Sequence, residues 1–351
     1  MKKLIFLFSI THFVFSQTEE VTFTEHISPI IYNNCTECHR PNESGPMSFT
    51  SYLEVASMAS MIVEVTQSGY MPPWPADPNY SSLLGERFLS DDEKELISQW
   101  VAQGYPEGEP SLEAPIPTFP EGSAVGEPDL IFTMEEDYFI EGNNYDDYRV
   151  FVFQTGFTED KYIRSIEFRP DNREAVHHAI IMADLSGEGQ MMDDQSPETL
   201  GYESFGGFGL TVPPSQYVFL GGYAPGMNPI VWSNDLGMKI PAGADILCQI
   251  HYAPSSIDEW DKSSINIFFK DAIEVNREVK MKMWVEPDLF IPANNPEVVV
   301  EECLNFAPFP MNYIGIQDCS LPEDWSILGI LPHCHLIGQS WEVYAETPEG
   351  E

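Results

Sequence analysis

Val176-His177-His178-Ala179-Ile180-Ile181 places two adjacent histidines at the head of an apolar run, in a chain of 351 residues and eight histidines. Most of the other histidines also stand in short motifs. His39 closes Cys35-Thr36-Glu37-Cys38-His39, and His251 lies in Cys248-Gln249-Ile250-His251-Tyr252. His333 and His335 form a His-x-His pair. Because neutral imidazole is a common ligand of copper, zinc and iron, this clustering predicts a metalloprotein.

The composition limits the class of protein. Hydrophobic residues make up 43% of the chain and aromatic residues 13%, which excludes a disordered chain. A chain of 351 residues can form two or three domains, each with its own core. The 56 acidic residues against 16 basic ones give a formal net charge of -40. Because phosphate binding needs clustered cations, we expect neither nucleic acid nor an anionic membrane as a partner.

Residues 1–17 are expected to be a secretory signal. Met1-Lys2-Lys3 is a short basic start, residues 4–15 form an apolar stretch that includes His12, and Ser16 is a small residue near the expected cleavage point. Spanning a bilayer takes about 20 apolar residues, and no later segment is apolar enough to do so. We therefore predict an exported protein, periplasmic or secreted, without a membrane span and in a compartment that permits disulfides.

Residues 18–105 show helical periodicity and are predicted to form an all-α domain. A short helix is expected over His26–Asn34, and a second over Ser51–Gly69. Ser90-Asp91-Asp92-Glu93 is a capping box ahead of an apolar helical face. Gly104 supplies the C-terminal stop of that last helix.

The Cys35-Thr36-Glu37-Cys38-His39 pentad, called the attachment motif below, is a signal for c-type haem attachment. Two thioethers from Cys35 and Cys38 tether the porphyrin, and the imidazole of His39 takes the proximal position on the iron. A zinc site is the alternative. It would require further cysteine or histidine ligands, and this part of the chain offers none beyond His26.

The second axial ligand of that haem is predicted to be Met71, in Gly69-Tyr70-Met71-Pro72-Pro73-Trp74. A stiff proline turn after a helix would present its thioether rigidly. The alternatives are a core role for Met71, because the segment also has Met47, Met58 and Met61, and His26 as the ligand instead. This stretch of about 85 residues resembles class I-type cytochrome c domains, whose Met-Pro-Pro-Trp turn carries the distal ligand.

Residues 106–128 are rich in proline and glutamate and are expected to form a semi-rigid linker. Beyond them the chain changes to short β-branched or aromatic segments separated by Gly, Pro, Asn and Asp, which predicts an antiparallel β-sandwich. The expected strands are 148–153, 162–168, 176–182, 217–220, 246–252, 265–269 and 279–284, followed by a second set at 298–300, 325–331 and 341–345.

The histidines on these segments can share metal ions if the strands place them together. His333 and His335 are two residues apart, so a strand would put both on one face. His177 and His178 would face opposite sides of an ideal strand, so a common metal requires a bulge or a strand end there. His251 would come from a neighbouring strand. Imidazole ligands without carboxylates favour copper or zinc over calcium or magnesium.

Five segments together resemble the copper type II, ascorbate-dependent monooxygenases, the family of peptidylglycine α-hydroxylating and dopamine β-monooxygenases. The similarity runs from about Asp129 to the end of the chain. The segments are Tyr148-Arg149-Val150-Phe151, Glu167-Phe168-Arg169-Pro170, Val176-His177-His178, Gln249-Ile250-His251-Tyr252 and His333-Cys334-His335-Leu336-Ile337-Gly338.

The resemblance implies two jelly-roll-like β-sandwich domains, 129–286 and 287–351, with one copper each. His177, His178 and His251 match the ligands of the electron-transferring copper, and His333 and His335 match two ligands of the oxygen-activating copper. The family completes the second site with a methionine further downstream. We therefore expect the second domain, of about 65 residues, to be incomplete. We do not expect Met311 to replace that methionine, because it precedes the pair.

The cysteines outside the attachment motif have two expected roles. Cys303 and Cys319 are plausible disulfide partners. Cys248 and Cys334 lie beside metal-binding histidines, but in regular strands they would face away from His251 and from the His333/His335 pair. A structural cysteine or a disulfide is therefore expected at each rather than a thiolate ligand, and four cysteines allow three pairings.

We predict an exported haem–copper oxidoreductase. Haem c, carried by the N-terminal domain, would pass single electrons to a copper monooxygenase that hydroxylates a C–H bond with O2. The haem would replace ascorbate as the electron donor or supplement it. A redox donor protein and a small-molecule or peptide substrate are expected partners, and the residues do not identify the substrate. The alternative is a non-catalytic electron-relay or copper-binding protein with a degenerate second site. A zinc hydrolase is a weaker option, because no His-Glu-x-x-His is present.

Overall fold

The computed structural model describes residues 20–41, 43, 45–74, 76–119, 122–196, 199–281, 289–295, 297–301, 326–332 and 338–344. The chain divides into two compact units, Met1–Lys282 and Met283–Glu351. Several predictions lie outside the described residues: the secretory signal of residues 1–17, Cys303, Met311, Cys319, His333, Cys334 and His335.

The N-terminal part of the first unit is a set of short helices around a small core of its own. A π-helix, η1 (Phe23–Ile27), leads into α1 (Ser28–Asn34), and α2 (Tyr52–Ser57), α3 (Ala59–Gln67) and α4 (Asp91–Ala102) follow. Phe23, Ile31 and Trp100 are fully buried in this core. The helix expected over Ser51–Gly69 is two helices, because the backbone at Met58 leaves helical geometry with ψ of 8°.

The predicted start and end of α4 are confirmed. The Ser90 hydroxyl accepts a hydrogen bond from the Glu93 amide at 3.3 Å, and the Glu93 carboxylate accepts one from the Ser90 amide at 2.8 Å. At the other end, Gly104 adopts a φ of 84°, which only glycine takes without strain. A capping box and a left-handed glycine satisfy the free backbone groups at the two ends of a helix. The local sequence was therefore sufficient to predict where α4 begins and ends.

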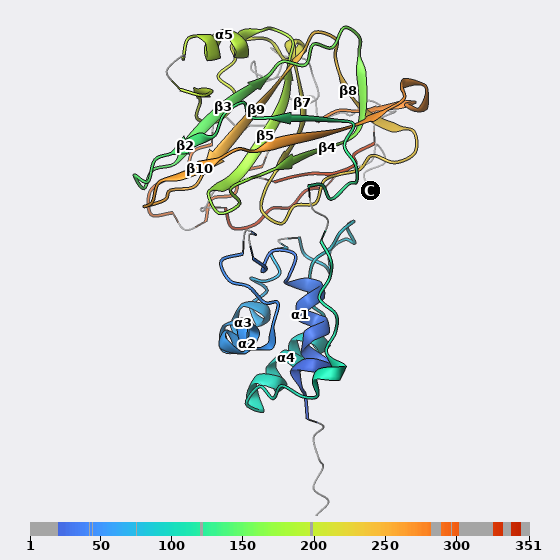
Figure 1. The fold of residues 1–351 in the computed structure, drawn as a ribbon, viewed down its shortest axis with the longest axis vertical. Helices are drawn as coiled ribbons and strands as arrows, with labels where there is room; N and C mark the ends of the chain where they lie inside the picture. The colour runs from blue at the N-terminus through green and yellow to red at the C-terminus, as the bar shows by residue number, and fades with distance from the viewer. Residues whose placement is uncertain are drawn as a thin grey trace, which may run out of the picture. The chain divides into compact units, whose positions relative to one another are not determined.

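Two five-stranded sheets and one small strand pair make up the β-structure of the first unit. The order of one sheet is β1-β11-β4-β8-β12, that of the other is β6-β3-β9-β5-β7, and β10 pairs with β2. Figure 1 shows β3, β9, β5 and β7 side by side. The bounds are β1 (Leu130–Thr133), β2 (Tyr138–Ile140), β3 (Asp147–Phe153), β4 (Lys161–Arg169), β5 (Val176–Asp184), β6 (Tyr202–Glu203), β7 (Tyr217–Tyr223), β8 (Leu236–Ile240), β9 (Asp245–Tyr252), β10 (Glu259–Asp261), β11 (Ser264–Lys270) and β12 (Arg277–Val279).

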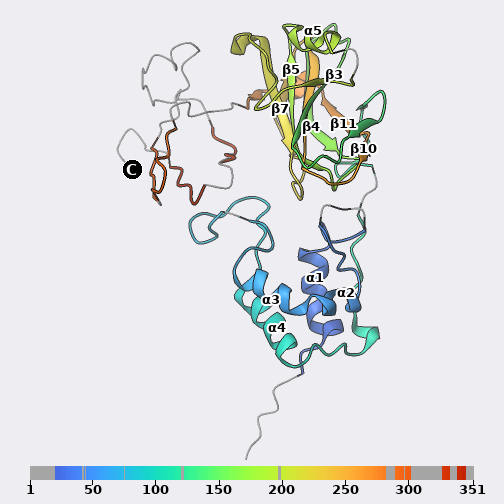
Figure 2. The ribbon, with the colours of Figure 1, turned by 90° about the vertical axis from the view of Figure 1, so that its left-hand side faces the viewer.

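A single apolar core lies between the two sheets. Ile163 on β4 and Ile267 on β11 face it from one sheet, and Ile181 on β5 and Ile250 on β9 from the other, and none of them is more than 1% exposed. Figure 2 shows the two layers, with β5 and β7 in one and β4 and β11 in the other. Each such side chain contributes about 1.5–3 kcal/mol by leaving water, so this core holds the central strands in place.

The predicted fold class is wrong. We expected an all-α cytochrome c domain followed by two antiparallel β-sandwiches. The structure is mostly β-sheet, the five α-helices of its described part are short, and no large all-α domain is evident there. One of the two five-stranded sheets is also mixed, since β12 pairs with β8 in parallel. Helical periodicity persists for only 6 to 12 residues at a time in α1 to α4, so these segments do not build a large helical domain.

The second predicted sandwich is part of the same correction. The described residues between 289 and 344 contain no strand, although residues 298–300, 326–331 and 341–344 have strand-like composition. A strand is stable only beside hydrogen-bonded neighbours and over an apolar face, and composition cannot supply either. The strands predicted within 148–269, in contrast, all lie in β3, β4, β5, β7, β9 and β11.

Several elements were not anticipated. They include the three- to five-residue strands β1, β2, β8 and β10, and the helix α5 (Glu188–Asp194). All of these elements are too short to show a hydrophobic period. The formation of the short strands therefore depends on the strands they pair with. Among the described residues, no helix is both long and apolar enough to cross a membrane.

Candidate metal centre and haem attachment site

A β-bulge at His177 turns two adjacent histidines toward the same place. In the pairing of β5 with β9, Val176 lies opposite Tyr252 and His178 opposite His251, so His177 is one extra residue on β5. A common metal was expected to require a bulge or a strand end at the adjacent histidines, and the register shift shows the first of these. A bulge adds a residue to one strand and rotates the backbone, which lets neighbouring side chains leave strict alternation.

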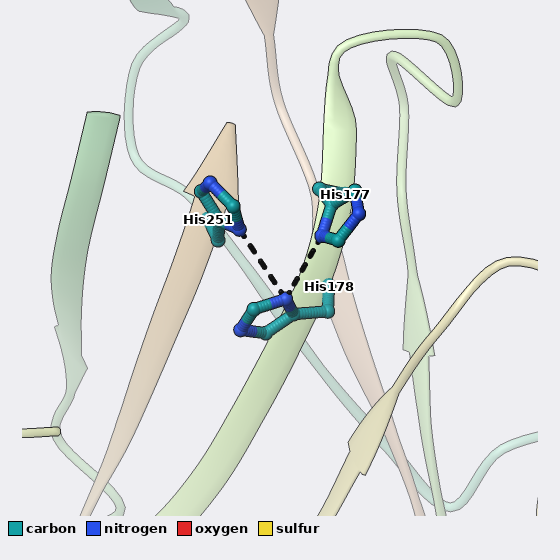
Figure 3. Close-up of side chains that lie close together, drawn as sticks. All are labelled: His177, His178 and His251. Atoms are coloured by element: carbon teal, nitrogen blue, oxygen red, sulfur yellow. Dashed lines mark hydrogen bonds between the residues drawn. The ribbon is translucent and has the colours of Figure 1, made fainter. Parts of the chain in front are cut away.

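The three side chains, called the histidine triad below, converge through the same ring nitrogen. Nδ1 of His178 lies 3.1 Å from Nδ1 of His177 and 3.3 Å from Nδ1 of His251 (Figure 3). One nitrogen of each ring lies within 4.8 Å of the others. Two of the residues come from β5 and one from β9, at the middle of a five-stranded sheet. His251 is buried, His178 half-buried and His177 exposed.

This geometry fits a metal ion held by imidazole. Two nitrogens that bind one ion at about 2.0–2.1 Å with a tetrahedral angle lie about 3.3–3.4 Å apart. The observed separations of 3.1 and 3.3 Å match that spacing. The ligand set contains no carboxylate, which suits copper or zinc and disfavours calcium and magnesium. The exposure of His177 leaves one side of the cluster open to solvent, so a further ligand or electron donor can approach.

The environment of His177 favours the neutral imidazole that a metal requires. Although the side chain of His177 is exposed, the residues around its ring shield it partly from water, and this desolvation lowers its pKa below the usual value. The neighbouring His251 lowers the pKa further, while Asp146 opposes the shift. A protonated imidazole cannot bind a metal ion. The lowered pKa therefore keeps this ligand available in mildly acidic solution.

Cys248 is not part of the metal cluster. It lies three residues before His251 on β9, is 1% exposed, and packs in the core between the sheets. Burial raises the pKa of its thiol well above the ordinary value, so no thiolate is present at neutral pH. The expectation that Cys248 faces away from His251 as a structural cysteine is confirmed.

The attachment motif directly follows α1 and presents its histidine in an ordered setting. Nδ1 of His39 lies 3.0 Å from the carbonyl oxygen of Met47, and the imidazole stacks on Phe49 with a centroid distance of 4.7 Å. If Nδ1 donates to that carbonyl, Nε2 carries the lone pair and is free to bind iron. A Cβ atom on Gly45 would lie 2.7 Å from His39 Nδ1, so only glycine permits this close approach.

Cys35, the first cysteine of the attachment motif, is a free thiol. Cys35 packs against the core of the helices, and burial raises its pKa to about 12. Cys38 is half-buried, and a Cβ atom on Gly226 would lie 3.1 Å from its Sγ atom. The motif thus has the residues and the spacing to hold a covalent haem, and its hydrogen bond and ring contact hold His39 in a fixed orientation.

The two candidates for the second haem ligand, Met71 and His26, lie in different settings. Met71 is half-buried and its amide donates to the Val65 carbonyl at the end of α3. The indole N–H of Trp74, in the same turn, is buried without a hydrogen-bond acceptor in the described part of the chain. An acceptor carried by a bound group would satisfy it. His26 accepts a hydrogen bond from the Thr22 amide at 3.1 Å through Nδ1, which is a capping role.

The attachment motif also lies beside the sheet that carries the triad. A cavity of about 140 Å³ is lined by Cys38, Arg40, Phe119, Arg173, Tyr223 and Met227, among others. Arg173, which precedes β5, forms an ion pair with Glu43, and Arg87 forms one with Glu37 of the motif at 3.1 Å. Tyr223 on β7 is the pairing partner of Ala179, the residue after His178. Few residues therefore separate the attachment motif from the triad.

Comparison with known proteins places the chain in no family: no family model and no curated protein matches it.

Two neighbours of the triad were missed from the sequence. Asp146 lies 2.7 Å from His251, and the ring of Tyr148 stacks on His251. Tyr148 lies in a segment that carries the family resemblance. Nothing in the sequence, however, indicated that Tyr148 or Asp146 contacts His251. Such a signal would have required the register of β3 against β9.

Proposed function

We propose that this chain is an exported haem–copper oxidoreductase, a copper-dependent monooxygenase that hydroxylates a C–H bond with O2. The convergence of three Nδ1 atoms from β5 and β9 carries the proposal. The resemblance of the histidine segments to the copper type II, ascorbate-dependent monooxygenases supplies the reaction class. In that reaction one oxygen atom enters the substrate C–H bond and the other leaves as water, with two electrons and two protons consumed.

Each group of residues has a distinct role in this proposal. His177, His178 and His251 hold a copper ion, which supplies one-electron redox chemistry when bound. Cys35 and Cys38 tether a haem, and His39 binds its iron with Met71 as the expected second ligand. His333 and His335 are expected to hold the copper at which oxygen reacts, and they lie outside the described residues.

The position of the attachment motif supports the haem as an electron donor to the triad. Cys38 lies against Gly226, Gly226 follows β7 by three residues, and β7 pairs with β5 beside His178. The Arg173–Glu43 ion pair joins the segment after the motif to the residues just before β5. A haem held at Cys38 would therefore be close to the sheet of the triad, with ascorbate or a redox protein as the external reductant.

An electron-relay or copper-binding protein is the second candidate. The histidine triad is a complete three-imidazole site by itself, so one copper could be bound without any contribution from His333 and His335. Such a protein would transfer electrons or hold copper without hydroxylating a substrate.

The copper-to-iron ratio of purified, copper-reconstituted full-length protein, in which two copper ions are expected, tests the proposal and separates the two candidates. Iron counts the haem. Two coppers per iron support the monooxygenase and justify a substrate screen by oxygen consumption. One copper per iron, lost on replacement of His178, supports the relay. Absence of bound copper overturns both. Absence of iron in a protein matured with haem contradicts the haem assignment alone.

A further inference from the structure

We infer that Asp146 is a positioning residue of the histidine triad, which holds His251 with its Nδ1 atom directed at the metal ion. The inference rests on the copper site of the proposed function. Nε2 of His251 lies 2.7 Å from Oδ1 of Asp146, whereas its Nδ1 lies 3.3 Å from Nδ1 of His178. The carboxylate therefore bonds one ring nitrogen and leaves the other for the metal.

This hydrogen bond selects the tautomer of His251. A neutral imidazole carries one N–H and one lone pair, and a carboxylate only accepts hydrogen bonds. Nε2 must therefore be the donor, and the lone pair stays on Nδ1, where the other two histidines converge. Metal-binding histidines commonly donate their second nitrogen to a carboxylate or carbonyl, which fixes the ring and raises its basicity as a ligand.

The register of two strands places Asp146 for this task. Tyr148 on β3 lies directly opposite His251 on β9, and its ring stacks on the imidazole with a centroid distance of 4.1 Å and an interplanar angle of 8°. Asp146 precedes Tyr148 by two residues. Side chains two apart in an extended chain share a face, so Asp146 points to the same side as Tyr148. His251 is thus held on its face by Tyr148 and at its edge by Asp146.

The turn before Asp146 is anchored to the chain that leaves β9. The amide of Asn144 donates to the Ser255 carbonyl at 2.8 Å, and the amide of Tyr145 donates to the Asn143 side chain at 2.9 Å. Asn144 adopts a φ of 62°, a conformation that asparagine tolerates better than most residues. The backbone of Asp146 is therefore fixed relative to the strand that carries His251 before any metal binds.

The positioning role of Asp146 is tested by measuring the copper affinity of Asp146→Ala and Asp146→Asn. Asp137→Asn is the matched control. Asp137 likewise has a nitrogen-bearing side chain as its partner, Lys262 at 3.4 Å, and its side chain is 62% exposed against 52% for Asp146. We expect Asp146→Ala to weaken copper binding about 10–100-fold while the number of ions bound at saturation stays the same. Asp146→Asn should lose less, because its amide oxygen still accepts from Nε2. Asp137→Asn should bind as the wild type does.

Pulsed electron paramagnetic resonance of the Cu(II) forms gives a readout that a loss of folding would not mimic. The quadrupole coupling of the non-coordinating nitrogen of an imidazole depends on its hydrogen bond. One of the three imidazole signals should change in both Asp146 variants, and none in Asp137→Asn. Wild-type affinity and an unchanged spectrum in Asp146→Ala would overturn the positioning role while leaving the copper site intact. Failure of the wild type to bind copper would overturn both.

Discussion

At the scale of single residues, the triad depends most on His178, because its Nδ1 lies between those of His177 and His251. Loss of a residue that only bonds a metal ligand lowers metal affinity about 10–100-fold. His178→Ala removes a ligand itself, so it should lower copper affinity by more than that. Competition with a copper chelator measures the change. His26→Ala is the control, since His26 bonds Thr22 and lies outside the triad. Equal affinity in His178→Ala and wild type would contradict the site.

The pKa of His177 gives the pH dependence of copper binding. Burial lowers this pKa, so the imidazole stays neutral below about 6.5, where an ordinary histidine becomes protonated. Protons compete with the metal only once the pH falls to the lowered pKa. His177 should therefore cause no loss of copper affinity between about pH 8 and about pH 6.5, and a loss only in more acidic solution. Affinity titrations across this range in wild type and His177→Ala would show it. A loss that begins above pH 7 and disappears in His177→Ala would contradict this assignment.

At the scale of elements, the site is made by β5, which pairs with β9 on one side and β7 on the other. The bulge at His177 lies on the β9 side. On the β7 side, Gly222 lies opposite Ile180, and a Cβ atom on it would meet the Ala179 carbonyl oxygen at 2.5 Å. A side chain at this position would thus push β7 away from the strand that carries His177 and His178.

Gly222→Ala should lower the free energy of unfolding by about 1–3 kcal/mol, the usual range when extra atoms are forced into a packed site. Urea unfolding followed by fluorescence measures it. Gly329→Ala is the control, because a Cβ atom there meets no heavy atom of the described residues within 4 Å and its backbone is not left-handed. An unchanged unfolding midpoint in Gly222→Ala would show that β7 and β5 are less tightly joined than the structure indicates.

At the scale of the whole molecule, the formal net charge of -40 dominates the electrostatics. Like charges repel more strongly in the compact state than in the extended chain, so they lower the stability of the fold. Raising the salt from about 0.01 M to about 0.15 M shortens the screening length from about 30 Å to about 8 Å. Tm at neutral pH should therefore rise by several degrees over this range.

Calorimetry at two pH values separates this effect from other actions of salt. The sequence has a pI near 4.2, so the repulsion is largely removed at that pH. The same change in salt should then have little effect on Tm. A rise in Tm of equal size at both pH values would contradict a dominant role for net charge and favour an effect of salt on apolar surface.

Local sequence determined the parts of this protein that depend on near neighbours in the chain. The attachment motif, the capping box at Ser90, the stop at Gly104 and the β-branched segments of the central strands are all recognisable from a few consecutive residues. The adjacent pair His177-His178 also indicated a bulge or a strand end if both bind one metal, since strict alternation would have separated the two rings.

The tertiary structure alone decided what depends on pairing between distant strands. The register of β5 and β3 against β9 brings His251 to His178 and places Asp146 and Tyr148 around it, although 105 residues separate Asp146 from His251. It also overturned the predicted fold class. Composition shows which segments can become strands, but hydrogen-bonded partners and a shared core decide which of them do, and these are non-local interactions.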